Sequence, residues 1–226
     1  MRSLKLVSVA DAATRLGLSE RRVRALAAKG QVPAQKIANR WFVEVDRLSE
    51  RRRSAGARGR PFSDRHALGL LFLASGEDPQ WLSAYEKWRL RRYALPRLSD
   101  LIPRLNQRAG VHSVRAPESL VKRLANDPNF IRSGVSAADH YRADISSRSV
   151  LDGYYKERAF KNLVYRYALQ PVPEGEANLV VRGIEDDTAL SRRQFMPVAV
   201  VAADLADSAD ARTRRAGMQL MRGLLS

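Results

Sequence analysis

The chain has 226 residues and carries 40 Lys and Arg against 24 Asp and Glu, which gives a formal net charge of +16. A hydrophobic content of 45% is enough for a packed core and excludes a wholly disordered chain. Cys is absent, which excludes disulfide bonds, a thiolate nucleophile and cysteine-ligated zinc. Since no apolar stretch has the length of a membrane span or the pattern of a signal peptide, we expect a cytoplasmic protein without membrane contact.

The positive charge is concentrated at the N-terminal end. Residues 1–61 hold 15 basic and 5 acidic residues, whereas residues 133–226 hold 13 and 12. Of the basic residues 33 are Arg, whose planar set of donors suits phosphates and guanine edges. A GC-rich genome would explain part of the Arg excess but not its clustering. The distribution therefore indicates a nucleic-acid-binding module attached to a nearly neutral second part.

The beginning of the chain predicts two short helices joined by a glycine turn. Ser8 is suited to cap the first helix, and Gly17 to end it because Gly tolerates positive φ. Ser19 is suited to cap the second helix, which Gly30 ends. Apolar spacing places one set of side chains on the inner faces of the two helices: Ala12, Ala13, Leu16, Val23, Leu26 and Ala27.

Residues 35–45 alternate loosely between polar and apolar side chains, which predicts a small β-wing after the two helices. In order, the segment contains Ala12-Ala13, Leu16-Gly17-Leu18, Ser19, Gly30-Gln31-Val32-Pro33 and Arg40-Trp41-Phe42. With these residues it resembles the excisionase/MerR-type helix-turn-helix. The resemblance implies a winged helix-turn-helix whose second helix enters the major groove of double-stranded DNA.

The outer face of the second predicted helix is basic and supplies candidate DNA contacts. We expect Arg21, Arg22 and Arg24 to contact base edges or nearby phosphates. Ser19 and Lys29 are expected to contact phosphates. The wing would reach the flanking backbone or the minor groove through Lys36, Asn39 and Arg40. The alternative is a solvated, charge-rich helix face with no ligand.

Residues 49–61 are rich in Arg, Gly, Ser and Ala and lack apolar periodicity, which predicts a flexible basic linker. It would join a DNA-binding domain over residues 1–48 to a second domain over residues 62–226. The linker ends in Arg58-Gly59-Arg60-Pro61, which resembles the core of an AT-hook. Arg58 and Arg60 would then lie in a narrow A·T minor groove. The alternatives are general attraction to phosphates and a segment that simply ends the linker.

Beyond the linker the periodicity predicts a helical middle. Helices are expected over residues 66–73, from Asp78 onward, and over residues 98–108. The helix from Asp78 carries large side chains at spacings of three or four, which is typical of a core-facing stripe: Trp81, Leu82, Tyr85 and Trp88. Its other side is basic and would extend the DNA surface or bind an acidic partner: Lys87, Arg89, Arg91 and Arg92.

From residue 110 onward short strands alternate with helices. The pattern predicts a C-terminal α/β domain, and with the winged helix-turn-helix and the helical middle it makes the fold mixed α/β (α+β). Strands are expected over residues 111–115, 130–132, 150–155 and 178–184. Helices are expected over residues 117–124, 136–141, 157–169, 197–206 and 209–225.

Four blocks of this region resemble the C-terminal domain of AbiE-type antitoxins. They are Ile131–Ala138, Val150–Tyr154, Glu176–Arg182 and Ala202–Ala206, the last continuing through Arg212 to Gly217. Members of that family regulate bacterial type IV (abortive-infection) toxin–antitoxin systems. They repress their own operon and counter a nucleotidyltransferase toxin. The resemblance therefore implies an antitoxin and autorepressor with such a toxin as its partner.

Two other functions remain open at the level of the sequence. One is an excisionase-like architectural protein that bends DNA for recombination, although about 165 residues follow the first module. The other is a nucleic-acid-modifying enzyme with a DNA-reading domain. Because one short module buries little surface, we also expect a homodimer on a two-fold operator, or the basic linker as an added anchor.

No pattern of residues predicts catalysis, so we expect neither an enzyme nor a cofactor. Glu185-Asp186-Asp187 is interpreted as a solvated turn, and Ser133-Gly134 as a tight turn rather than a phosphate cradle. Asp139 and Asp144 do not form the Asp-x-Asp pair that two-metal nucleotidyl transfer needs. The three histidines lack the spacing of metal ligands, and no metal site is expected: His66, His112 and His140.

Overall fold

A computed structural model describes residues 6–16, 19–28, 34–37, 40–44, 61–145, 149–185, 187–190 and 193–224 of the protein. Backbone contacts divide the chain into two units, Met1–Arg58 and Gly59–Ser226. The division falls inside the Arg-rich segment over residues 49–61. Among the described residues, no helix is both long and apolar enough to cross a membrane.

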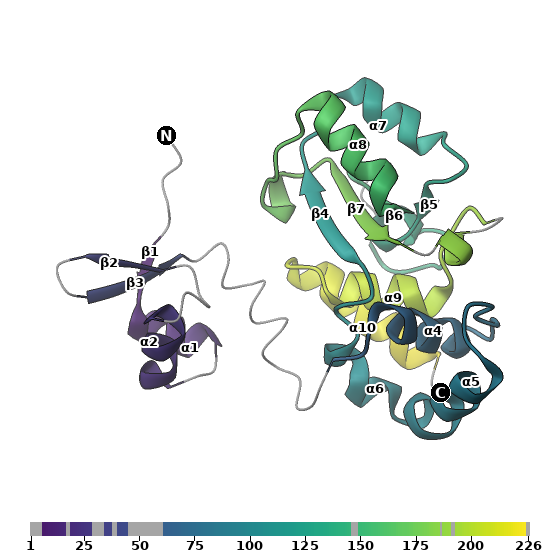
Figure 1. Ribbon diagram of the computed structural model, residues 1–226, viewed down its shortest axis with the longest axis horizontal. Coiled ribbons are helices and arrows are strands. Elements are labelled where there is room, and N and C mark those ends of the chain that lie inside the picture. Colours follow the sequence, from purple (N-terminus) through teal and green to yellow (C-terminus); the bar gives the residue numbers. More distant parts are fainter. Residues whose placement is uncertain are drawn as a thin grey trace. The chain divides into compact units, whose positions relative to one another are not determined.

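The first unit is a three-stranded antiparallel sheet packed against two helices (Figure 1). The strands lie in the order β1-β3-β2, so that β2 and β3 form the hairpin expected as the wing. The elements in chain order are β1 (Leu6–Ser8), α1 (Val9–Leu16), α2 (Glu20–Ala28), β2 (Ala34–Ile37) and β3 (Arg40–Glu44). Side chains from both helices and from β3 form its small core: Val9, Ala12, Ala13, Val23, Leu26 and Val43.

The two serine caps predicted for this unit are present. The backbone N–H of Asp11 donates to Ser8 Oγ at 3.1 Å, and that of Arg22 donates to Ser19 Oγ at 3.3 Å. Each hydroxyl thus satisfies an amide that has no partner inside its helix. The strand β1 is absent from the prediction because three residues carry too little alternation to be recognised. It pairs with β3 along its whole length.

The second unit begins with a run of short helices. α4 is buried over residues 67–73, as predicted. The remaining helices are short and change type along the chain. The elements are α4 (Asp64–Ala74), α5 (Ala84–Arg89), the π-helical turn η1 (Leu90–Ala94), the 3-10 turn η2 (Leu95–Arg97), α6 (Leu98–Leu101) and the 3-10 turn η3 (Ile102–Arg104).

This helical middle differs from the prediction at two points. The second helix begins at Ala84 rather than at Asp78, because Ser83 and Glu86 form a reciprocal capping box that fixes its first turn. The single helix expected over residues 98–108 is divided into α6 and η3. Pro103, which has no N–H to donate, stands in the first turn of η3.

The C-terminal part of the second unit contains a four-stranded mixed sheet in the order β4-β7-β6-β5. The central strands β6 and β7 are parallel, and each edge strand is antiparallel to its neighbour. All four strands lie within two residues of their predicted bounds. The elements are β4 (Gly110–Val114), α7 (Glu118–Ala125), β5 (Ile131–Arg132), the 3-10 turn η4 (Gly134–Ala137), β6 (Leu151–Lys156), α8 (Glu157–Tyr167), the 3-10 turns η5 (Glu174–Glu176) and η6 (Asp187–Leu190), β7 (Leu179–Ile184), α9 (Val198–Ala206) and α10 (Ala211–Gly223).

The helix predicted over residues 136–141 is only the short turn η4. Ser133 occupies its cap position, but no side-chain capping bond forms there. Its hydroxyl instead donates to the carboxylate of Asp204 on α9. The side chain that would stabilise a longer helix is therefore engaged elsewhere.

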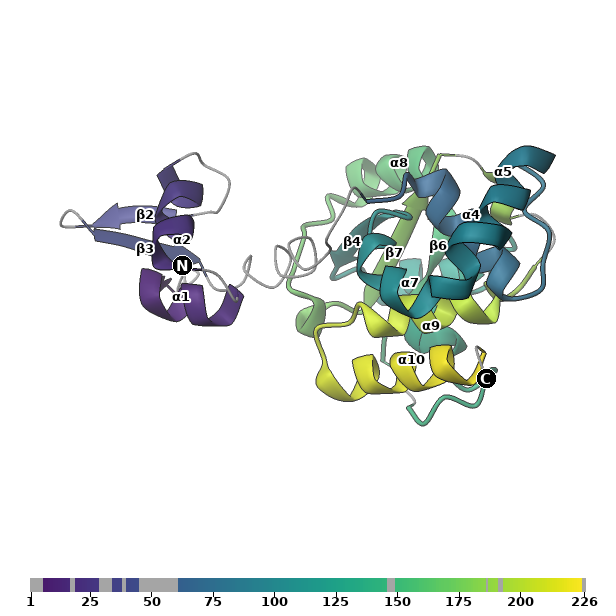
Figure 2. The same ribbon diagram turned by 90° about the horizontal axis from the view of Figure 1, so that it is seen from below.

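Helices cover both faces of the sheet (Figures 1 and 2). α7 and α8 lie on one face, where Phe160 and Val181 share a core. α4, α9 and α10 lie on the other face, where Phe72, Val200 and Ile184 share a second core. Because side chains alternate along β7, one strand contributes to both cores. The helical middle and the sheet thus belong to one folded unit.

Candidate nucleic-acid interface

The helix α2 turns a basic face away from the core of the first unit. Val23 and Leu26 are buried on its inner side, whereas Arg21 and Arg22 are exposed on its outer side. Within the described part of the chain no ion pair involves either of these two arginines. Both guanidinium groups are therefore available to an anionic ligand.

Arg24 differs from its neighbours because it has an internal partner. Its Nη2 lies 2.5 Å from the Glu20 carboxylate one turn earlier, and both side chains are about half exposed. A DNA phosphate would have to compete with that carboxylate for Arg24. Ser19, also predicted to contact DNA, is exposed and caps the helix through its Oγ. Its hydroxyl thus lies at the positive end of α2, where anions are favoured.

The wing hairpin places its two described basic residues on opposite faces. Lys36 is opposite Trp41 in the β2–β3 register, and Ile37 is opposite Arg40. Directly opposed residues share a face, and successive residues alternate. Lys36 therefore lies on the face of Trp41 and Arg40 on the other, although both are exposed. We therefore expect either Lys36 or Arg40, rather than both, to contact a given DNA surface.

Several predicted contacts lie outside the described residues and stay predictions. They are Lys29, Asn39, and Arg58 and Arg60 of the AT-hook-like segment. The same holds for the glycines expected to end the two helices, Gly17 and Gly30.

The helix pair with its hairpin has a counterpart among known protein families. Residues 6–55 match the family described as a helix-turn-helix domain. The first unit is a helix-turn-helix domain. Such domains bind double-stranded DNA by placing the second helix in the major groove, so the exposed face of α2 is the candidate reading surface. Comparison with curated proteins and with solved structures yields no match.

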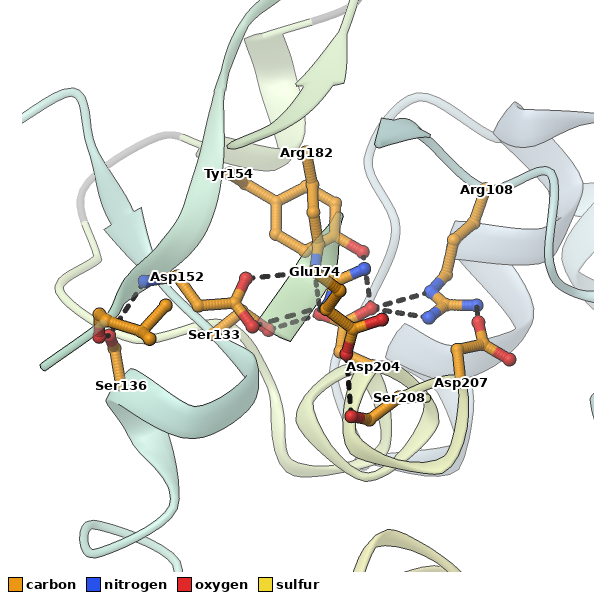
Figure 3. Close-up of polar contacts among 11 residues, drawn as sticks. Arg108, Ser133, Ser136, Asp152, Tyr154, Glu174, Arg182, Asp204, Asp207 and Ser208 are labelled. Carbon is orange, nitrogen blue, oxygen red and sulfur yellow. Dashed lines mark hydrogen bonds and ion pairs between the residues drawn. The ribbon is translucent and has the colours of Figure 1, made fainter. Parts of the chain in front are cut away.

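The second unit contains a set of buried charges that the sequence alone did not reveal. We call it the buried charge cluster (Figure 3). Its centre is the Asp204 carboxylate on α9, which accepts hydrogen bonds from Arg108 Nε at 2.9 Å and from Tyr154 Oη at 3.2 Å. Arg182 Nε also lies 3.3 Å from Asp204 Oδ2. The members of the cluster are Arg108, Ser133, Asp152, Tyr154, Arg182 and Asp204, none more than 7% exposed.

The cluster balances two cations against two anions. Arg182 bridges Asp204 and Asp152, with Nε 3.2 Å from Asp152 Oδ1. Burial raises the pKa of Asp152 to about 6, because desolvation disfavours its charged form more than Arg182 favours it. Burial likewise raises the pKa of Tyr154, which stays a neutral donor. Each charged member therefore has a partner, and the cluster ties α9 to the sheet.

Four separate sequence blocks meet at this cluster: Ile131–Ala138, Val150–Tyr154, Glu176–Arg182 and Ala202–Ala206. Ser133 lies in the first block, Asp152 and Tyr154 in the second, Arg182 in the third and Asp204 in the fourth. The sequence signal for the cluster is weak, because each member is a single polar residue in an apolar block. The residues come together only when the strands pair.

The sequence predicted that the large side chains from Trp81 to Trp88 all face the core, and this prediction is wrong for Tyr85 and Trp88. Trp81 and Leu82 pack against the core, but Tyr85 and Trp88 on α5 are 66% and 50% exposed. α5 begins later than expected, and the inward positions of the continuing turn are taken by Leu90 and Ala94. Trp81 and Leu82 precede α5, so the four residues do not form the single helix face that their spacing predicted.

Proposed function

We propose that the protein is a transcriptional regulator that occupies promoter DNA through its helix-turn-helix domain. The observation that carries the proposal is the pair Arg21 and Arg22, exposed on the reading helix with no carboxylate partner among the described residues. Such arginines contact guanine edges in a bidentate manner or neutralise phosphates. We expect two copies on a two-fold operator, or the basic linker as an added anchor, since a single module buries little surface.

A gel shift with the DNA that precedes the gene tests this proposal. Replacing both arginines, Arg21→Ala/Arg22→Ala, is expected to weaken specific retention at least about 30-fold, since each bidentate base contact is worth about 1–3 kcal/mol. The matched control is Arg212→Ala/Arg215→Ala on α10, which removes the same charge from an exposed helix of the second unit. Equal loss in both variants, or no loss in either, would contradict base reading by α2.

For the second unit we propose the finer role of an antitoxin that counters a nucleotidyltransferase toxin encoded beside it. The support is the resemblance of four blocks, whose polar residues meet in one buried cluster rather than lying apart. Repression of the operon would then be autorepression. The alternative, an excisionase-like architectural protein, is disfavoured by the extent of the second unit, Gly59–Ser226.

Co-expression with the neighbouring gene separates these roles. If the neighbour arrests growth and the full chain restores it, the antitoxin proposal is supported. A neighbour without toxicity, together with an altered frequency of DNA excision, supports the architectural alternative. Metal-dependent turnover of nucleic acid by the purified chain would contradict both proposals and indicate an enzyme.

A further inference from the structure

The exposed side of α5 and η1 carries a face of aromatic and arginine side chains. The residues stand at positions i, i+3, i+4, i+7 and i+8, so they lie along one side of the helical turn. We call them the aromatic–arginine face: Tyr85, Trp88, Arg89, Arg92 and Tyr93. Leu90 and Ala94 are the buried residues of the same turn. The face is therefore an outer surface of the second unit.

Trp88 contacts both of the other rings of this face. Tyr85 and Trp88 are stacked with centroids 6.0 Å apart, and Trp88 meets Tyr93 edge-on at 5.9 Å. The guanidinium of Arg92 lies over the Tyr93 ring at 6.0 Å. With rings of about 200 Å² exposed by half to two-thirds, the patch reaches on the order of 300–400 Å². A continuous apolar patch of that size commonly marks an interaction site.

Among the described residues, neither arginine of this face has an acidic partner. No ion pair involves Arg89 or Arg92 within the described ranges, although the carboxylate of Asp78 pairs with Lys87 on the other side of the helix. Unpaired arginines beside apolar rings select carboxylates at the edge of an apolar surface. The composition is also that of interface hot spots, which are rich in Trp, Tyr and Arg.

We infer that the aromatic–arginine face is the docking site of a partner protein that presents an apolar surface edged by carboxylates. A second copy of the chain is a disfavoured occupant, because it would bring like-charged arginines together. The N-terminal residues 1–61 are disfavoured as well, because they carry a net charge of +10 and would repel the arginines of this face. Single-stranded nucleic acid needs open ring faces for its bases, but here Tyr85 and Trp88 stack on each other and Arg92 lies over Tyr93, so that one face of each ring is occupied. The phosphates of duplex DNA would contact the arginines but not the aromatic rings.

Binding of two designed peptides to the full chain tests the inference. One is an amphipathic helix of Leu and Glu, and the other replaces every Glu by Gln. We expect the Glu peptide to bind at least tenfold more tightly in fluorescence anisotropy. Trp88→Ala should weaken its binding at least tenfold. Arg89→Ala/Arg92→Ala should remove the preference for Glu over Gln.

Controls separate the face from general attraction to a basic chain. Tyr165→Ala/Arg166→Ala on α8 removes an exposed tyrosine and arginine from another surface and is expected to leave peptide binding unchanged. Arg21→Ala/Arg22→Ala should also leave it unchanged. An unchanged thermal midpoint would show that Trp88→Ala is folded, as expected for a half-exposed ring.

Four results would overturn the inference. They are equal affinity for the Glu and Gln peptides, binding that does not depend on Trp88, displacement of the Glu peptide from this face by a single-stranded oligonucleotide, and Trp88-dependent self-association in analytical ultracentrifugation. None of these readouts involves promoter binding or rescue from a toxin, so the inference and the proposed function fail independently.

Discussion

The carboxylate of Asp204 on α9 accepts a hydrogen bond from Nε of Arg108 at 2.9 Å, although 96 residues separate the two in the chain. Arg108 also pairs with Asp207 at 2.7 Å, one turn further along. Arg108 follows the helical middle, so this contact joins the N-terminal part of the second unit to the C-terminal helices. Both side chains are almost fully buried. Loss of the Asp204 carboxylate would leave Arg108 with Asp207 and Arg182 with Asp152, so that two buried guanidinium groups would each lose a carboxylate in a medium of low dielectric constant.

Asp204→Asn is therefore expected to lower the free energy of unfolding of the second unit by about 3 kcal/mol. Asn keeps the shape of the side chain but withdraws the charge that Arg108 and Arg182 face. Urea unfolding followed by the fluorescence of Trp81 alone, with Trp41 and Trp88 replaced by Phe, would report on this unit. Asp139→Asn at an exposed position is the matched control and should change stability by less than about 0.5 kcal/mol. A similar loss in both variants would show that the cluster holds no special role.

The raised pKa of Asp152 makes the stability of the second unit depend on pH. Burial raises this pKa from 3.8 to about 6, so the folded chain holds the proton more tightly than the unfolded chain. The resulting stabilisation is full below about pH 4 and is lost as the pH rises through 6. The stability of the native chain relative to Asp152→Asn should thus fall by up to about 3 kcal/mol between pH 4 and pH 7. Denaturant titrations at each pH measure this difference, and a flat or rising difference would contradict it.

Local features of this fold could be predicted from the sequence, and long-range ones could not. A cap such as Ser19 lies three residues from the amide it satisfies, so its signal is contained in a short stretch of chain. Strands such as β7 were recognisable from their β-branched composition. Asp204 gave no signal, because its partners lie on other elements and one Asp in an apolar helix has no period. Tyr85 and Trp88 could not be placed from the sequence either, since helical spacing does not reveal which face of a helix meets the core.

Substitutions at three glycines of the second unit distinguish the cost of backbone strain from the cost of steric overlap. Gly134 has a φ of +48°, and a Cβ added there would lie only 1.8 Å from Asp152 Oδ2. Gly76 has a φ of +76° with open space around it, and Gly175 has neither constraint. We expect Gly175→Ala to be nearly neutral and Gly76→Ala to destabilise by about 1 kcal/mol. Gly134→Ala should destabilise by more than about 3 kcal/mol, because the clash displaces a buried carboxylate.

Thermal or urea unfolding of the second unit measures the loss of stability in all three variants. The expected order of loss is Gly175→Ala, then Gly76→Ala, then Gly134→Ala. If Gly134→Ala costs no more than Gly76→Ala, the Asp152 side chain can move without breaking its contact with Arg182. The close approach would then have no energetic consequence.

Glu20 and Arg24 form an ion pair on the reading helix α2. The pair is exposed and contributes only about 0.3–0.5 kcal/mol to the helix, so removing it leaves the domain folded. Glu20→Gln removes a negative charge beside the DNA and frees Arg24 for a phosphate. We expect this variant to bind promoter DNA more tightly at low salt and to release about one more counterion. The plot of log Kd against log [KCl] should become steeper by about one unit.

Arg24→Ala distinguishes a released arginine from a simple change in charge. In the native background it should weaken binding only slightly, because Arg24 is already engaged by Glu20. In the Glu20→Gln background it should remove the entire gain, since the added contact would be made by Arg24 itself. If the gain of Glu20→Gln persists without Arg24, the effect is the loss of repulsion between Glu20 and the phosphates. Arg24 would then belong to the fold of α2 rather than to the DNA surface, and the reading of DNA would depend on Arg21 and Arg22.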